Sequence, residues 1–334
     1  MTVDVAAAVQ ADFGLAVRSL RRVRSGADEA ARTWEAVADG GGRFAVKLSR
    51  GGRPTGLLVS ARLADSGVPG VPAPVRTLDG RPWSERDGHR LSVVPWVSDE
   101  RALDRGLRPE QWSSFGRLLR SVHDVPVPPD VARLLPREGH RHDTITARVH
   151  QVTAVAERTA PDAAADPVAS EVCRRWEAAL PTITRLERAA DDVAARFRNE
   201  PADHVLCHGD PHLGNVLVGA AGTVWLVDWD DAMLSDRERD LMFLTVGVLA
   251  FAPMFDDGRA AFFSSYGDAQ PDPRRLAYFA CTRALDDVSG FAAEALDRTT
   301  DLGERSKALE IMAGILSPDG LVPLAADAVA ALDG

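Results

Sequence analysis

The sequence HGDPHLGN at residues 208–215, followed by DWD at residues 228–230, is the most informative part of the chain. Phosphoryl transfer uses a loop aspartate that reaches the attacking hydroxyl group, an asparagine that turns back to hold Mg²⁺, and a second aspartate that holds metal on the phosphates. Asn215 follows Asp210 by five positions and Asp228 follows Asn215 by thirteen, in that order. Two short strands between them predict a hairpin that returns Asp228 toward Asn215. The pattern therefore indicates phosphoryl-transfer chemistry.

A second motif lies upstream, in the sequence FAVKL at residues 44–48. Protein kinases carry their phosphate-binding lysine on such a strand, and their HRDxxxxN and DFG motifs follow later in the chain. Lys47 is one of two lysines among 39 basic residues. The turn over the phosphates should fall at residues 25–31, where backbone amides at Ser25 and Gly26 would contact them.

The first 95 residues have the pattern of a small, mostly antiparallel β unit with one helix. Alternating segments and turn glycines predict hairpins over residues 16–50. A helix is expected at Pro54–Asp65, and two more strands are expected at Pro72–Leu78 and Arg90–Val94.

Helical patterns dominate after Trp96, apart from the strand–loop–strand region at residues 203–230. Gln111–His123 has apolar residues at a clean helical period, and residues 143–198 are helical around a loop near 160–167. We therefore expect an α+β protein with a nucleotide-binding lobe at residues 1–95. A helical lobe at residues 96–334 would carry the catalytic loop and the substrate site.

Composition limits the classes of partner. The 334 residues include 39 basic and 49 acidic side chains, a formal charge of −10, which argues against nucleic acid or a membrane surface as partner. The negative net charge is compatible with a cationic small molecule as the ligand. The three cysteines are too few for a disulfide framework, and no signal peptide or membrane span is evident, so we expect a cytoplasmic protein.

Each motif alone has an ordinary explanation. HGD can be a capped turn, a strand that ends in lysine is often an edge strand, and DWDD can be a solvated acidic turn. Their kinase order and spacing favour the functional interpretation.

HGDPHLGN with DWD, in place of HRD and DFG, resembles the aminoglycoside phosphotransferase family, relatives of protein kinases that phosphorylate small molecules. Residues 206–219 and 228–243 look like the spectinomycin phosphotransferase branch of that family. The resemblance implies a protein-kinase-like fold of two lobes that uses ATP and Mg²⁺. It also implies a hinge near Val94 and Trp96 that hydrogen-bonds adenine through its backbone.

The resemblance gives roles to six residues. It implies that Asp210 is the catalytic base and that Lys47 holds the ATP phosphates. The other four are the implied Mg²⁺ ligands, Asn215 and Asp228, and the residues that support the loops, His208 and Asp230.

The sequence departs from the kinase plan in one respect. An acid on the helix of the small lobe normally orients the lysine, but residues 48–64 contain neither Asp nor Glu. Asp28, Glu29 or Asp65 would have to substitute for it.

Acidic residues suggest the class of substrate. Carboxylates that hold no metal could receive the ammonium groups of an aminocyclitol through charge-assisted hydrogen bonds. The candidates are Asp231, Glu238, Asp240, Asp286 and Asp287. The alternative is a solvated acidic face, paired with Arg237, Arg239 and Arg283.

We therefore expect an O-phosphotransferase that uses ATP and Mg²⁺ to phosphorylate a hydroxyl of a cationic, spectinomycin-like aminocyclitol or aminoglycoside and so confers resistance. The alternatives are a kinase of another antibiotic, a nucleoside or a choline-like alcohol, and a pseudokinase that binds nucleotide without turnover.

Overall fold

The computed structural model describes residues 4–23, 31–51, 53–159, 166–198, 200, 203–247, 256–267 and 270–332. Ser25, Gly26, Asp28 and Glu29 lie outside the described residues. The chain forms two compact units. The first comprises Met1–Pro136, Val205–Leu234 and Ala260–Asp268, and the second comprises Arg137–His204, Ser235–Arg259 and Ala269–Gly334. The lobe boundary expected at residue 95 stays a prediction.

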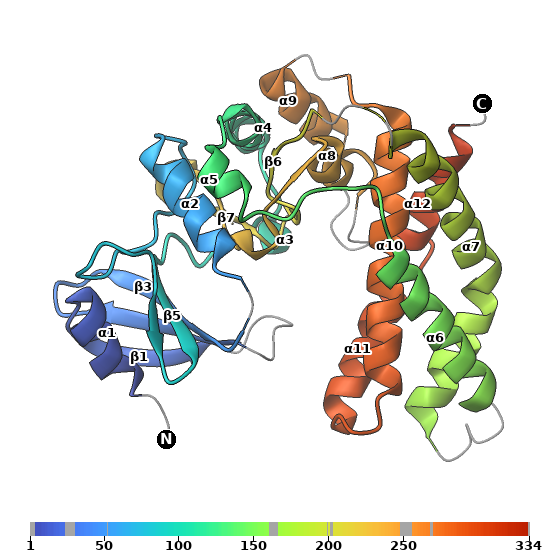
Figure 1. Cartoon of the computed structure of the whole chain (residues 1–334), viewed down its shortest axis with the longest axis horizontal. Helices are drawn as coiled ribbons and strands as arrows, with labels where there is room; N and C mark the ends of the chain where they lie inside the picture. Colours follow the sequence, from blue (N-terminus) through green and yellow to red (C-terminus); the bar gives the residue numbers. More distant parts are fainter. Residues whose placement is uncertain are drawn as a thin grey trace. The chain divides into compact units, whose positions relative to one another are not determined.

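An antiparallel five-stranded sheet forms the N-terminal part of the first unit (Figure 1). Its order is β1-β2-β3-β5-β4, so the predicted hairpins are confirmed. The strands are β1 (Val17–Val23), β2 (Ala31–Ala38), β3 (Arg43–Ser49), β4 (Ser84–Arg86) and β5 (His89–Pro95).

The strand expected at residues 72–78 does not form as a named strand, and this prediction is wrong. Pro72 and Pro74 lack the amide hydrogens that a sheet ladder needs. The amide of Val75 still donates to the carbonyl of Val93, at 2.8 Å.

The two faces of the sheet have different surroundings. On one face, α1 (Val5–Phe13) packs its apolar residues on buried strand residues that include Val46, Leu91 and Val93. Strand side chains alternate between faces, so Lys47 and its register partner Ser92 lie on the opposite face. That face carries the polar residues that the site uses.

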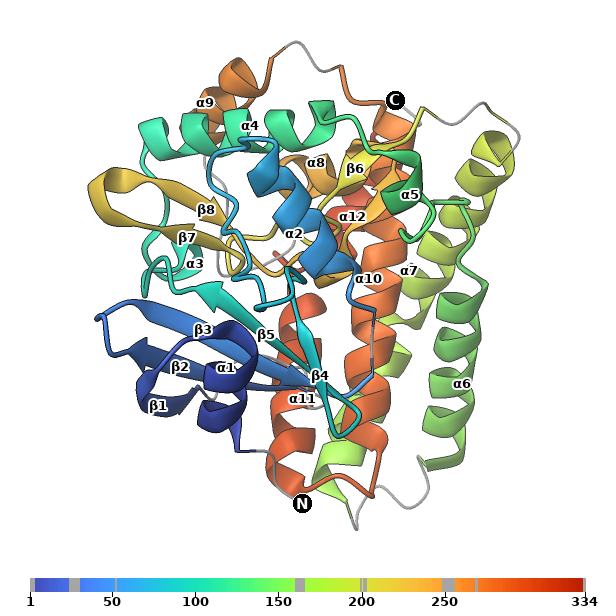
Figure 2. The same ribbon diagram turned by 60° about the vertical axis from the view of Figure 1, so that its left-hand side comes forward.

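The remainder of the first unit holds short strands and helices. The β7–β8 hairpin and the β6–β9 pair form two small sheets, and α4 runs along one side of the hairpin (Figure 2). The elements are α2 (Thr55–Asp65), α3 (Ala102–Arg105), α4 (Pro109–Asp124), α5 (Pro129–Ala132), β6 (Val205–Cys207), β7 (Val216–Val218), η2 (Ala220–Gly222), β8 (Val224–Leu226), η3 (Trp229–Asp231) and β9 (Met233–Ser235).

Helices build the second unit around α10, whose buried residues include Phe279, Leu285 and Val288. The helix α10 packs against α6, α7, α8, α11 and α12 (Figure 1). The bounds are α6 (Asp143–Thr159), α7 (Pro167–Phe197), α8 (Glu238–Thr245), α10 (Pro273–Leu296), α11 (Leu302–Ile315) and α12 (Leu321–Ala330), while α9 (Asp256–Tyr266) belongs to both units. Over the described residues, none of the helices combines the length and apolar character that a membrane span requires.

Candidate active site

His208 joins the loop between β6 and β7 to the end of β8. The amide of Asp210 donates to its Nδ1 at 3.3 Å, so the ring hydrogen is assigned to Nε2, which donates to the carbonyl of Val227 at 2.9 Å. The residue is completely buried, and its ring meets that of Trp229 edge-on with centroids 4.6 Å apart. These contacts connect the 208–215 loop to the DWD segment.

Asp210 and Asn215 meet within the same loop. The side-chain Nδ2 of Asn215 donates to the backbone carbonyl of Asp210 at 2.9 Å and lies 3.3 Å from its Oδ2. The amide of Val227 donates to the carbonyl of Asn215 at 3.0 Å, which brings the strand before Asp228 next to Asn215. The return of the hairpin expected from the sequence is therefore confirmed.

His212 is a site residue that the sequence reasoning missed. Its Nδ1 accepts from the amide of Gly214 at 2.9 Å, so its Nε2 carries the hydrogen and faces Oδ2 of Asp210 at 3.4 Å. A Cβ on Gly214 would lie 2.5 Å from the imidazole, so a larger residue there would require the His212 ring to shift. The signal was the second histidine within residues 208–215.

Asp228 has an unusual backbone conformation, with φ 64° and ψ 69°. Left-handed values are costly for a residue other than glycine and often occur at functional sites. Surrounding protein raises the pKa of its carboxyl; Asp230 and Asp231 add to this rise, and the charge of Lys47 opposes it. The side chain of Asp228 is still exposed to solvent, because it lines an open cavity, although many protein atoms surround that cavity. Such a carboxyl is suited to a cation.

Lys47 pairs with an acid from the DWD segment. Its Nζ lies 2.6 Å from Oδ2 of Asp230. Asp65, one of the acids considered from the sequence, lies at the end of α2 and pairs with Arg76 at 2.6 Å. Lys47 is therefore paired with Asp230 and not with Asp65.

A cavity of about 510 Å³ brings several predicted residues together. Lys47, Val94, Trp96, Asp228 and Asp230 line it. Among its lining residues in the described part of the chain, Asp210 and Asn215 are absent. Its remaining walls come from the sheet face opposite α1, from α2, from residues 95–99 and Arg101, and from Pro72, Leu217, Val227 and Trp229.

The segment after β5 is fixed to the start of β3. The amide of Trp96 donates to the carbonyl of Arg43 at 2.9 Å, and its indole Nε1 donates to Asp99 at 2.9 Å. The Arg43 guanidinium stacks 5.4 Å from the indole centroid and pairs with Asp99 at 2.8 Å and Glu35 at 2.7 Å. Trp96 is thus held at the cavity wall.

The five acids considered for substrate binding have different surroundings. Asp231 is exposed in the first unit. The others belong to the second unit, where Asp286 pairs with Arg148 and Asp287 pairs with Arg283 at 2.8 Å. Two are buried there, Glu238, which accepts from the amide of Asp272 at 3.0 Å, and Asp240. Their role in substrate binding stays a prediction.

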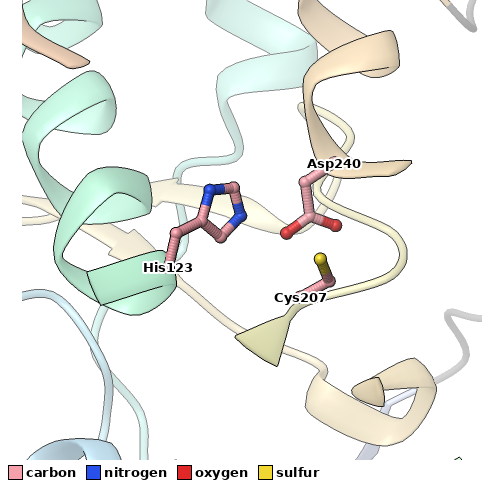
Figure 3. Close-up of side chains that lie close together, drawn as sticks. All are labelled: His123, Cys207 and Asp240. Atoms are coloured by element: carbon pink, nitrogen blue, oxygen red, sulfur yellow. The ribbon is translucent and has the colours of Figure 1, made fainter. Parts of the chain in front are cut away.

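A second polar cluster lies inside the first unit. His123 of α4 and Cys207 of β6 are both buried in this unit and are labelled in Figure 3. Nδ1 of His123 lies 2.6 Å from the hydroxyl of Tyr266. Two donors from this unit are fewer than the four ligands of a structural zinc site.

Comparisons with known proteins agree with this geometry. A model of the phosphotransferase enzyme family matches residues 19–279. Streptomycin 3''-kinase of Streptomyces griseus is 30% identical over 220 residues, which cover 63% of this chain and 72% of that protein.

Solved structures share the fold. A spectinomycin phosphotransferase, solved with ADP and spectinomycin, has a TM-score of 0.80 at 22% identity over 96% of both chains. An amicoumacin kinase, solved with AMP-PNP and Ca²⁺, has a TM-score of 0.62 at 14% identity over 95% of this chain and 93% of its own. The predicted kinase-like fold is confirmed.

Proposed function

The chain belongs to the phosphotransferase enzyme family and is a small-molecule kinase, and we propose that it transfers the γ-phosphate of ATP to a hydroxyl of a cationic aminocyclitol or aminoglycoside antibiotic. The observation that carries the proposal is that Lys47, Asp228 and Trp96 line one and the same cavity. We assign nucleotide binding to a lobe at residues 1–95. A lobe at residues 96–334 carries the catalytic loop and the acceptor site.

Asp210 is proposed as the base that accepts the proton of the acceptor hydroxyl. Asn215 donates to the backbone carbonyl of Asp210, and Nε2 of His212 faces its carboxylate, so both ends of Asp210 are held in position. A fixed carboxylate is what general-base catalysis requires, because the geometry of proton transfer comes before the pKa.

The nucleotide is proposed to occupy the cavity of about 510 Å³. The ammonium group of Lys47 would contact its phosphates, since a compact charge suits phosphate oxygens. The backbone at Val94 and Trp96 would hydrogen-bond the base. Ser25 and Gly26 are proposed to contact the phosphates through their amides.

Asn215 and Asp228 fit a magnesium ion. Both offer oxygen atoms, the ligand type that Mg²⁺ prefers. Nδ2 of Asn215 is engaged with Asp210, which leaves Oδ1 as the ligand atom. The surrounding protein raises the pKa of the Asp228 carboxyl, and a bound cation would favour its ionised form. When bound, the ion would neutralise charge on the phosphates.

A cationic antibiotic as acceptor is supported by charge and by the relatives. The chain carries a formal charge of −10, and the relatives include a streptomycin kinase and a spectinomycin phosphotransferase. Asp231, Glu238, Asp240, Asp286 and Asp287 are the acids proposed to attract it. Phosphorylation of such an antibiotic would confer resistance.

An ADP-release assay tests the proposal. Purified protein is given ATP or GTP with MgCl₂ and, separately, spectinomycin, streptomycin, a second aminoglycoside, choline or a nucleoside. We expect ATP-dependent ADP release with at least one aminocyclitol, and mass spectrometry that shows one added phosphate. Turnover restricted to choline or a nucleoside would overturn the acceptor class. ATP binding without turnover on any acceptor would favour a pseudokinase.

A further inference from the structure

The pair of Lys47 and Asp230 replaces an interaction that kinases make with a helix. In the kinase plan an acid on the helix after the lysine strand orients that lysine. Here the helix is α2, which has no acid before Asp65, and Asp65 is engaged with Arg76. The carboxylate 2.6 Å from Lys47 comes from η3, 183 positions later in the chain.

The helix α2 contacts the DWD segment through its backbone. A Cβ placed on Gly56 would lie 2.5 Å from the carbonyl oxygen of Trp229 and 3.0 Å from the amide nitrogen of Asp230. Real Cβ atoms do not approach backbone that closely, so only glycine allows this packing. The first turn of α2 thus rests directly on the peptide that carries Asp230.

The other side of the DWD segment is also fixed. The indole of Trp229 is buried, donates to the carbonyl of Leu226 at 3.1 Å and packs edge-on against His208. Asp230 therefore extends from a peptide held between α2 and the 208–215 loop. A carboxylate on such a rigid support can position another group.

We propose that Asp230 is the positioning residue that orients Lys47 toward the nucleotide phosphates, and that Gly56 holds the segment that carries Asp230. This inference rests on the proposed function, because it assigns Lys47 to phosphate binding. Asp230 thus supplies the negative charge that an acid on the helix supplies in kinases. The helix α2 supplies a backbone contact with the peptide that carries Asp230.

A competing role would have the opposite effect on binding. If Asp230 paired with Lys47 only until phosphates arrived, it would compete with them, and its removal would strengthen nucleotide binding. If it orients Lys47, its removal weakens binding. The sign of the change in Kd separates the two roles.

Calorimetry with Mg·ATP and the full chain measures this sign. We expect Asp230→Asn to raise Kd about tenfold, and Asp230→Glu, which keeps the carboxylate, to stay within about threefold of wild type. Asp65→Asn is the matched control, because its ion pair with Arg76 is exposed. In a Lys47→Met background, Asp230→Asn should change Kd less than about twofold, since the interacting partner is gone.

Gly56→Ala tests the backbone contact. We expect a rise in Kd comparable to that of Asp230→Asn, and little further rise when the two are combined. Gly290→Ala, at a helical position where a Cβ meets nothing within 4 Å, should leave Kd unchanged. Gly116→Ala, which would meet the carbonyl of Phe262 at 2.3 Å, should lower the melting temperature without changing the Kd of the folded protein.

An unchanged or lower Kd in Asp230→Asn overturns the inference and leaves the proposed function standing. Wild-type protein that binds no nucleotide overturns both. A Gly56→Ala protein that folds and binds ATP normally removes Gly56 from the proposal, and circular dichroism verifies its fold.

Discussion

The side chain of Asn215 donates to the main-chain carbonyl of Asp210 at 2.9 Å, so the proposed base and a proposed metal ligand are parts of one turn. The spacing of five positions between Asp210 and Asn215 allows the turn to close. Gly214 has no Cβ, which leaves room for the His212 ring within the turn. A change of the Asp210 side chain leaves this backbone hydrogen bond in place and should therefore affect chemistry more than folding.

Asp210→Asn should lower kcat by about two to four orders of magnitude, the range of a lost general base. The backbone hydrogen bond from Asn215 survives this change, so the melting temperature should stay within about 2 °C. ADP-release kinetics and thermal melts measure the two quantities. Asp203→Asn, an exposed change just before β6, is the control. Near-normal kcat in a folded Asp210→Asn protein would remove Asp210 from the mechanism.

Nucleotide binding should depend on Mg²⁺, and Asp228→Ala should abolish that dependence. Desolvation by the surrounding protein raises the pKa of the Asp228 carboxyl, so protons should compete with the ion at a pH where an ordinary carboxyl is already ionised. The Mg²⁺ dependence should thus weaken as pH falls toward that pKa. Titration calorimetry of ATP with and without MgCl₂ measures both effects. Unchanged Mg·ATP binding in the variant contradicts the assignment.

Lys47→Arg should lower kcat/KM for ATP by about tenfold or more, although the charge is kept. The planar guanidinium is larger than an ammonium and has a different donor geometry, so it displaces the phosphates. The other lysine provides the control: Lys307→Arg, exposed on α11, should have no effect. Full activity in Lys47→Arg would show that a compact ammonium is not needed.

Local patterns predicted much of this site. The FAVKL motif predicted a strand that carries Lys47, and Lys47 lies on β3 as expected, because the alternation of a strand is set by its own backbone. The two short strands after HGDPHLGN likewise predicted the hairpin that brings Val227 next to Asn215. Both features depend on a few neighbouring residues.

Long-range partners could not be predicted in the same way. Lys47 meets Asp230 across 183 positions, and that pairing depends on how α2 packs against η3. The buried states of Glu238 and Asp240 were also hidden, because charged residues are ordinarily exposed. A sequence pattern does not show that the carboxylate of Glu238 accepts from the start of α10.

The second unit should lose stability in acid through Asp236. Burial alone would raise the pKa of Asp236, but the hydrogen bond with His140 at 2.9 Å and the ion pair with Arg275 at 2.5 Å outweigh it and lower the pKa. The carboxylate therefore contributes stability above its unfolded pKa, near 3.8, and this contribution is lost as pH falls through the lower folded value.

Asp236→Asn should accordingly reduce the free energy of unfolding by about 2–4 kcal/mol at pH 7, because Arg275 loses a buried partner. Below about pH 3 the difference in the free energy of unfolding between variant and wild type should become smaller, because Asp236 itself becomes protonated there. Urea denaturation at both pH values measures this, with Asp191→Asn, an exposed partner of His142, as the control. A gap that does not change with pH would show that charge on Asp236 is not what stabilises the unit.

The acceptor site allows a test on Asp231, which is exposed directly after Asp230 in η3. If Asp231 contacts an ammonium group of the acceptor, Asp231→Asn should raise the acceptor KM by about tenfold or more, the effect of one charge-assisted hydrogen bond. The Kd for ATP should stay the same.

The dependence on salt tells a direct contact from long-range attraction. At high salt the rise in acceptor KM should persist if Asp231 contacts the acceptor. It should fade if Asp231 only attracts the acceptor from a distance, because exposed charges are screened beyond about 8–10 Å. Steady-state kinetics at two salt concentrations distinguish these cases, with Asp319→Asn, an exposed acid before α12, as the control. An acceptor KM within twofold of wild type at both salt concentrations would mean that Asp231 belongs to a solvated face and takes no part in recognising the acceptor.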